Sequence, residues 1–208
     1  MNVSGGSIWN VGANGVLHVG GFGGSGTGTL HITSGTVSGG TFNVAMNSGI
    51  MGAVYVNGGS SQLSMSNGIS IGQGGTGVMN ISNGGSVFSP SGTFSSVGNY
   101  GGGTGSVSIT GGGSSWTAGA LTLSRASSSI TVSGGGLLDT RGLFMVQNNA
   151  GLNIEATGNL EAATLQVWQG GTAQLSGTVR ANVITVDGAG STVFQTNDNV
   201  TIDNGAGV

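Results

Sequence analysis

The side chains that could perform acid–base chemistry are few and lie in the second part of the chain. The chain has 208 residues with three arginines, no lysine and six acids, and no charged side chain precedes Arg125. The acids are Asp139, Glu155, Glu161, Asp187, Asp198 and Asp203. Hydrolysis of a glycosidic bond needs two carboxylates that face that bond. Glu155 and Glu161 are expected on two different strands of one repeat, so their carboxylates are predicted to lie on different faces.

A polysaccharide lyase would need a basic side chain beside a calcium-binding cluster of acids. Arg180, which is near Asp187 in the sequence, is a weak candidate for such a base. The Asp-Gly at 187–188 and the Asp-Asn-Gly at 203–205 are more simply interpreted as turns. The sequence therefore predicts no catalytic residue, and a polysaccharide-active β-helix enzyme is kept as a second alternative function.

The histidines and cysteines do not predict a metal site. His18 and His31 each occupy an outward position between apolar residues, on two strands of one predicted turn, so they are predicted to project from different faces, with no third ligand beside them. The chain has no Cys, which excludes disulfides, thiol catalysis and thiolate ligands. The Gly-x-Gly strings follow no strand-to-helix transition, so nucleotide binding is not predicted. We expect no metal and no cofactor.

The aromatic side chains offer a different chemistry, since a ring with a polar end can stack on a sugar. Trp9 and Trp116 occupy corresponding repeat positions and are predicted to close a corner of the core. Trp168 is next to the inward Val167 and is predicted to be exposed. Trp168 and Tyr55 are therefore the weak candidates for stacking on a glycan.

The elements that carry these side chains are predicted to be strands. The chain contains 47 Gly, 28 Ser, 21 Thr and 18 Asn, which together make up 114 residues, and a single Pro. A disordered chain is normally less hydrophobic and more charged than this one, with its 36% hydrophobic and 4% charged residues. Glycine disfavours helix by about 1 kcal/mol per site, and collagen needs Gly at every third position. An all-β protein rich in turns remains.

A repeat runs along the chain, in which two apolar residues flank one polar residue. It is clearest in GTGTLHITSG (26–35), GTGVMNISNGG (75–85) and GTGSVSITGGG (103–113), with the looser MGAVYVNGGS (51–60) between the first two. Such alternation predicts a short strand with one buried face. A second apolar series, Phe94 and Val97 included, recurs in parallel, and a third includes Leu137 and Val179.

Three such strands in each repeat fit one turn of a β-solenoid in which successive turns pair in parallel at about 4.8 Å. The sequence predicts about nine turns of three short strands each, and loops that shorten toward the C-terminus. Equivalent side chains, such as those of Leu17, Phe42 and Ile69, are expected one above another inside. The predicted core comprises Leu17, Val19, Leu30, Ile32, Ile69, Ile71, Ile81, Val107, Ile109, Ile130, Val132, Leu152 and Ile154.

The chain is predicted to form one solenoid domain over residues 1–208, with clear paired repeats over 1–135 and shorter, degenerate turns over 136–208. The pairing comes from GGSIW (5–9), GGSSQ (58–62), GGGSSW (111–116) and GAGSTV (188–193), which place Trp9, Gln62, Trp116 and Val193 at corresponding positions.

This alternation of G-x-G-x-L-x-I-S-x-G-G with G-x-G-S-x-W and L-x-V-G resembles the repeat of autotransporter (type V secretion) passengers and PEP-CTERM-associated surface proteins. The matching stretches are GVLHVG (15–20), GTGTLHITSG (26–35), GISIGQGGTGVMNISNGG (68–85) and GGGTGSVSITGGGSSWTAGALTL (101–123). The resemblance implies a right-handed parallel β-helix that is exported to the cell surface, and it implies no particular ligand.

The predicted function is a non-enzymatic, secreted or cell-surface passenger segment that acts as a stalk or adhesin and can self-associate. Expected partners are host-cell or matrix glycans and proteins, or a second copy of the chain. A net charge of −3 gives no electrostatic attraction for nucleic acid, and no apolar stretch reaches the roughly 18 residues that cross a membrane. Residues 1–6 have no basic or apolar run, so targeting segments are expected outside this chain.

The first alternative is a subunit of an extracellular filament. Neither end of the sequence resembles a capping element, and residues 200–202 are still predicted to be a strand. Uncovered strand edges can stack end to end. Electron microscopy of the purified chain separates long fibres from isolated rods.

Overall fold

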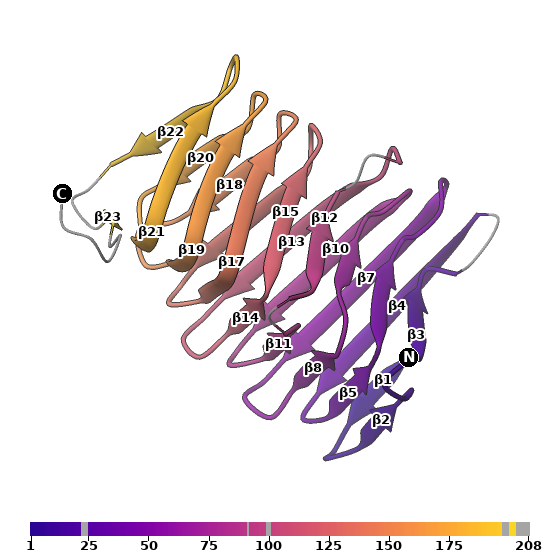
Figure 1. Cartoon of the computed structure of the whole chain (residues 1–208). Helices are drawn as coiled ribbons and strands as arrows, with labels where there is room; N and C mark the ends of the chain where they lie inside the picture. Colours follow the sequence, from indigo (N-terminus) through magenta and orange to yellow (C-terminus); the bar gives the residue numbers. More distant parts are fainter. Residues whose placement is uncertain (22–24, 91, 99–100, 197–199, 203–208) are drawn as a thin grey trace.

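The computed structural model describes residues 1–21, 25–90, 92–98, 101–196 and 200–202, and within these ranges every regular element is a strand. The chain coils as a right-handed parallel β-helix, with its first and last turns at opposite ends of a rod (Figure 1). Eight complete turns are followed by two strands of a ninth, close to the predicted number. In the described part of the chain, no helix is long and apolar enough to cross a membrane.

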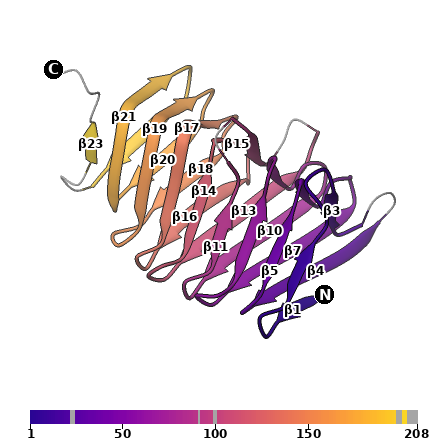
Figure 2. The ribbon, with the colours of Figure 1, turned by 60° about the horizontal axis from the view of Figure 1, so that its bottom comes forward.

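Face 1 of the rod is a nine-stranded parallel sheet that receives the first strand of every turn (Figure 2). Its strands are β1 (Asn2–Ser4), β4 (Gly26–Thr33), β7 (Ile50–Asn57), β10 (Thr76–Ser82), β13 (Thr104–Thr110), β16 (Ser129–Ser133), β18 (Gly151–Ile154), β20 (Thr172–Leu175) and β22 (Thr192–Gln195).

Faces 2 and 3 belong to one 14-stranded sheet that bends along its length. Face 2 begins with β2 (Ile8–Asn10), β5 (Thr36–Gly39), β8 (Gln62–Met65), β11 (Ser86–Phe88) and β14 (Ser115–Ala118). Face 3 begins with β3 (Val16–Val19), β6 (Thr41–Val44), β9 (Ile69–Ile71), β12 (Phe94–Val97) and β15 (Ala120–Ser124). Beyond these, β17 (Leu137–Gln147), β19 (Asn159–Trp168) and β21 (Thr178–Asp187) each cross both faces, and β23 (Val200–Ile202) pairs with β21.

The prediction of three separate strands in each turn is therefore wrong from β17 onward. Gly119 alone separates β14 from β15, and Gly142 lies next to it in the following turn, where a Cβ would be 2.6 Å from the Gly119 carbonyl oxygen. In β17 the corner is reduced to an irregularity in the register between Thr140 and Leu143. The loops between faces 3 and 1 also shorten, from residues 20–25 in the first turn to 169–171 in the seventh, as predicted.

The core consists of apolar columns that run along the rod. Leu17 pairs with Phe42 and Phe42 with Ile69 on face 3, as expected from the intervals. All thirteen predicted core residues are buried, with exposures between 0% and 8%. On face 1, Ile32, Val56, Ile81, Ile109, Val132 and Ile154 form one continuous column. Each apolar side chain is covered by its neighbours above and below, which no single turn could provide.

The predicted inward position of Phe94 is wrong. Phe94 is 77% exposed, and Ser95 takes the buried place beside Ile69 and Leu121. Phe94 and Val97 are three residues apart, and alternate residues of a strand point to opposite faces, so both cannot point inward. The Ser95 hydroxyl is satisfied in the core, because it accepts a hydrogen bond from the Ile69 N–H at 3.1 Å and lies 3.0 Å from the Ser89 hydroxyl.

Three further positions differ from the sequence-based register. Leu138, which is fully buried, takes the place predicted for Leu137. Val193 pairs with Ala173 on face 1, so the GAGSTV stretch belongs to a different corner from that of Trp116. The intervals also predict that Val200 continues the apolar series of Leu17 and Phe42 on face 3, but Val200 pairs with Val179 on face 2. These shifts arise because loop lengths vary from turn to turn. A constant number of residues per turn then predicts the wrong pairing partner in the neighbouring turn.

The glycines of the repeat form a column of their own. Gly28, Gly52, Gly77 and Gly105 pair in register near the start of the face 1 strands. There the strand passes directly beside the end of the face 3 strand, and a Cβ on Gly52 would be 2.6 Å from the Val19 carbonyl oxygen and 3.0 Å from the Ala45 nitrogen. The second Gly of the recurring Gly-Thr-Gly is thus required by close backbone approach.

Buried serines hold together turns at the corners between the faces. The Ser61 hydroxyl donates to the Asn57 carbonyl and accepts from the Ser34 N–H of the preceding turn. Ser114 does the same with the Thr110 carbonyl and the Gly84 N–H. At this corner serine and glycine alternate from one turn to the next, and this alternation is a physical basis for the pairing of the repeats.

Candidate functional site

A row of charged side chains lies on the outer surface of face 2. The outward positions of this face pair in register along the rod: Asn10, Ser38, Ser64, Phe88, Thr117, Asp139, Glu161 and Arg180. The first five are uncharged, and the last three are charged and adjacent. Strand alternation directs every member outward, and the turn length sets which residues become neighbours.

Two ion pairs connect the charges of this row. Arg141 Nε lies 3.3 Å from Asp139 Oδ2, and Arg180 Nη1 lies 3.9 Å from Glu161 Oε1. The Arg180 side chain is 70% exposed and that of Glu161 is 52% exposed. Ion pairs this exposed stabilise a protein by about 0–1 kcal/mol. The four side chains carry no net charge together, so the row attracts neither strongly anionic nor strongly cationic ligands.

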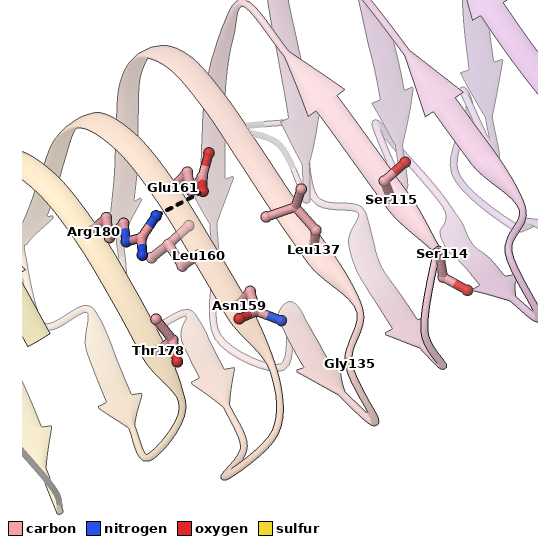
Figure 3. Close-up of a pocket in the computed structure, with 10 residues that line it drawn as sticks. Ser114, Ser115, Gly135, Leu137, Asn159, Leu160, Glu161, Thr178 and Arg180 are labelled. Carbon is pink, nitrogen blue, oxygen red and sulfur yellow. Dashed lines mark ion pairs between the residues drawn. The ribbon is translucent and has the colours of Figure 1, made fainter. Parts of the chain in front are cut away.

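Two shallow hollows flank the pair of Glu161 and Arg180. The first has a volume of about 460 Å³. Figure 3 shows the ion pair at one side, with Leu137, Asn159 and Thr178 on the neighbouring strands. The second, of about 570 Å³, extends toward Asp139. Together they offer guanidinium donors, carboxylate acceptors, an amide and hydroxyls along an open surface, which suits a hydrogen-bonding ligand.

Sequence analysis identified the acids but missed this arrangement. Glu155 follows β18 while Glu161 lies in β19, so these two acids are on different parts of the turn, as predicted. Arg180 pairs with Glu161, whereas Asp187 lies at the far end of β21 and accepts a hydrogen bond from the Gly188 N–H. Asp198 and Asp203 lie outside the described residues.

A signal for the row was present in the intervals. Asp139, Glu161 and Arg180 are 22 and 19 residues apart, which matches the shrinking length of the turns. Applying the interval to charged residues as well as to apolar ones would have placed the three side chains next to one another.

The two histidines lie on different faces, as predicted, with His18 in β3 and His31 in β4. His31 stacks on Tyr55 with the ring centroids 4.8 Å apart and the planes 8° from parallel. Among the described residues, no three His, Cys, Asp or Glu side chains gather as a metal site would require.

The tryptophans occupy three environments. Trp116 is fully buried, as predicted, with its indole N–H unpaired. Trp9 is half-buried against the core. Trp168 is half-buried rather than exposed, and its indole lies against Gly188. One face of the Tyr55 ring is occupied by His31. Stacking of Trp168 or Tyr55 on a glycan stays a prediction.

Comparison with known proteins identifies no family for this chain. No family model matches the chain, and no curated protein matches it. Among solved structures, the chain is similar to the crystal structure of the TibC-catalyzed hyper-glycosylated TibA55-350 fragment, at 15% sequence identity and a TM-score of 0.22. The similarity covers 96% of this chain and 93% of the other.

Proposed function

We propose that the chain is a non-enzymatic β-helix passenger segment, secreted or displayed on the bacterial surface, that acts as a stalk and adhesin. The observation that carries the proposal is the apolar core that runs the length of the coil, which makes the segment a rigid rod with an open outer surface. Eight intervals between nine face 1 strands give a length of about 38 Å at the usual strand spacing. The resemblance of the repeat to autotransporter passengers supports export.

Several features of face 2 support a binding rather than a catalytic role. Asp139 and Glu161 are neighbours, but each is paired with an arginine. Hydrolysis of a glycosidic bond needs two carboxylates that face that bond, whereas each of these two faces an arginine. The hollows beside Glu161 are also open, so they do not exclude water from a reacting bond.

The outer surface favours contacts through hydrogen bonds. Hydroxyls and amides dominate its rows, and no charged side chain precedes Arg125. Groups of this kind can bind sugars or a second copy of the chain without the cost of removing charges from water. Host or matrix glycans and proteins are the partners that this surface suits.

A filament subunit is a second candidate. Large apolar side chains are exposed on the first turn at Met1, Ile8 and Val16, and on the last described strands at Val183, Val186 and Phe194. Exposed apolar surface favours association, and stacking of one rod on the next would cover these side chains.

The experiment combines display with microscopy. Intact cells of the source organism are treated with protease and probed with an antibody to the segment, and the purified chain is imaged by electron microscopy. Loss of the signal on protease treatment, with isolated short rods that bind cells or matrix, supports the stalk and adhesin. An antigen accessible only after lysis contradicts it, and long unbranched fibres favour the filament.

A further inference from the structure

A third hollow lies on face 2, away from the charged row and on the uncharged part of the rod. It has a volume of about 380 Å³ and spans β2, β5, β8 and β11. Its lining includes Asn10, Ser38, Ser64, Phe88 and Pro90. We propose that this hollow binds a neutral saccharide, an inference that rests on the proposed function and names the ligand class and the place of contact.

The floor presents free hydrogen-bonding groups. Ser38 and Ser64 are directly paired neighbours on adjacent strands, and neither hydroxyl has a hydrogen-bond partner among the residues that the structure describes. Asn10 Oδ1 accepts a hydrogen bond from the Gly12 N–H at 2.8 Å, which fixes the amide and leaves its NH₂ group for a ligand. Two hydroxyls and an oriented amide in a row match the donors and acceptors of sugar hydroxyls.

The walls come from unequal corner lengths. Residues 11–15 join β2 to β3 and residues 89–93 join β11 to β12, whereas Gly40 alone joins β5 to β6. The 11–15 corner lies against Gly39 and Gly40, and it borders the hollow on one side while Pro90 borders it on the other. The Thr93 hydroxyl donates to the Pro90 carbonyl at 2.7 Å, which fixes one corner, and the Ser66 hydroxyl donates to the Ala13 carbonyl at 3.0 Å, which anchors the other.

Phe88 provides the apolar side of the hollow. It is 38% exposed and occupies the outward position of β11, beside Ser64. An aromatic ring beside polar groups is the arrangement by which proteins contact the C–H face and the hydroxyl rim of a sugar together. Asn10 and Phe88 are separated by three strand spacings, about 14 Å, which suits an oligosaccharide rather than a single sugar.

The electrostatics select a neutral ligand. No charged side chain occurs among the first 124 residues, and the residues that line this hollow are all uncharged. A sulfate or carboxylate group on a glycan would lose hydration here without gaining a counter-charge. Neutral hexose and N-acetylhexosamine oligomers carry no such cost.

The experiment compares two exposed phenylalanines from one turn. The purified full chain is screened against immobilised neutral and acidic oligosaccharides, and the strongest neutral ligand is titrated by calorimetry. We expect Phe88→Ala to raise Kd about tenfold, which corresponds to about 1.4 kcal/mol, and Ser64→Leu to abolish binding by filling the floor. Phe94→Ala is the matched control, because Phe94 flanks the same corner outside the hollow, and its Kd should stay within about twofold.

Circular dichroism verifies that each variant is folded. If Phe88→Ala does not fold, Ser64→Leu tests the site in its place. Retention of binding in both variants, or its loss only on Arg180→Ala, would overturn the assignment in favour of the charged row. Binding of acidic glycans alone would overturn it as well. If no neutral glycan binds while the displayed chain still attaches to cells, the saccharide site is wrong and the proposed adhesin stands. If the chain is not displayed but binds glycans through Phe88, the saccharide site stands and the proposed adhesin is wrong.

Discussion

Substitution of Gly52 by alanine tests whether close backbone approach explains the glycine column of face 1. The added Cβ would lie 2.6 Å from the Val19 carbonyl oxygen, 2.6 Å from Val44 Cγ1 and 3.0 Å from the Ala45 nitrogen. Ordinary contacts of a carbon begin at about 3.5 Å, so the neighbours would have to move by almost 1 Å. Two of these atoms form one hydrogen bond, since the Ala45 N–H donates to the Val19 carbonyl at 2.9 Å.

The expected cost follows from these contacts. Insertion of one carbon into a well-packed core costs about 1–3 kcal/mol, and a Gly-to-Ala change recovers about 0.4–1 kcal/mol by restricting the unfolded chain. The net destabilisation of Gly52→Ala should be about 1–2 kcal/mol. For a chain of this size, each kcal/mol lowers Tm by about 2–4 °C.

A matched glycine provides the control. Gly59 lies in the corner after β7, and its φ angle is outside the left-handed region. A Cβ added to Gly59 would have no atom within 4 Å. Gly59→Ala should therefore be neutral or slightly stabilising. Urea denaturation and hydrogen exchange measure the difference, with protection lost first in β4, β7 and β10. Equal stability of the two variants would refute close backbone approach as the reason for the glycine column.

Three further changes test the core, the serine contacts and the charged row. Ile81→Ala removes a fully buried side chain from the face 1 column and should cost about 2–5 kcal/mol in denaturant unfolding; a change below half a kcal/mol would contradict the packed column. Ser114→Ala leaves the Thr110 carbonyl and the Gly84 N–H unpaired and should cost about 1–3 kcal/mol, whereas Ser115→Ala on the outer surface should stay within about 0.5 kcal/mol. Glu161→Gln should change stability by less than about 1 kcal/mol at any salt concentration, and a larger loss would mean that the Glu161–Arg180 pair is structural.

The apolar columns were predictable because two periodicities reinforce each other. Alternation within a strand fixes which side chain points inward, and recurrence at the turn length fixes which side chains are stacked. Leu30 and Ile32 satisfy both conditions and lie where they were expected, as do Val107 and Ile109. Burial of such a column is the dominant favourable term, so errors of register there are strongly disfavoured.

Other parts were not predictable because they depend on corner lengths. Corners of one to five residues separate the strands of faces 2 and 3, and each added residue shifts the alternation of the next strand. The corners between faces 1 and 2 vary as well, with four residues before β14 and three before β17, and Leu137 was therefore placed one residue from the buried Leu138. The fusion of two strands into β17 is a limiting case, since there the corner has almost vanished.

The position of the hollows follows from the same dependence. A β-helix repeats its core faithfully because the columns must match, but nothing requires its corners to match. The corner at residues 11–15 lies against Gly40 and, with Pro90 on the other side, borders one hollow. Toward the other end, the continuous strands β17, β19 and β21 bring Asp139, Glu161 and Arg180 together beside the two other hollows of this face. One face thus offers an uncharged site and a charged one along a single rigid axis, and that axis fixes the separation between the two.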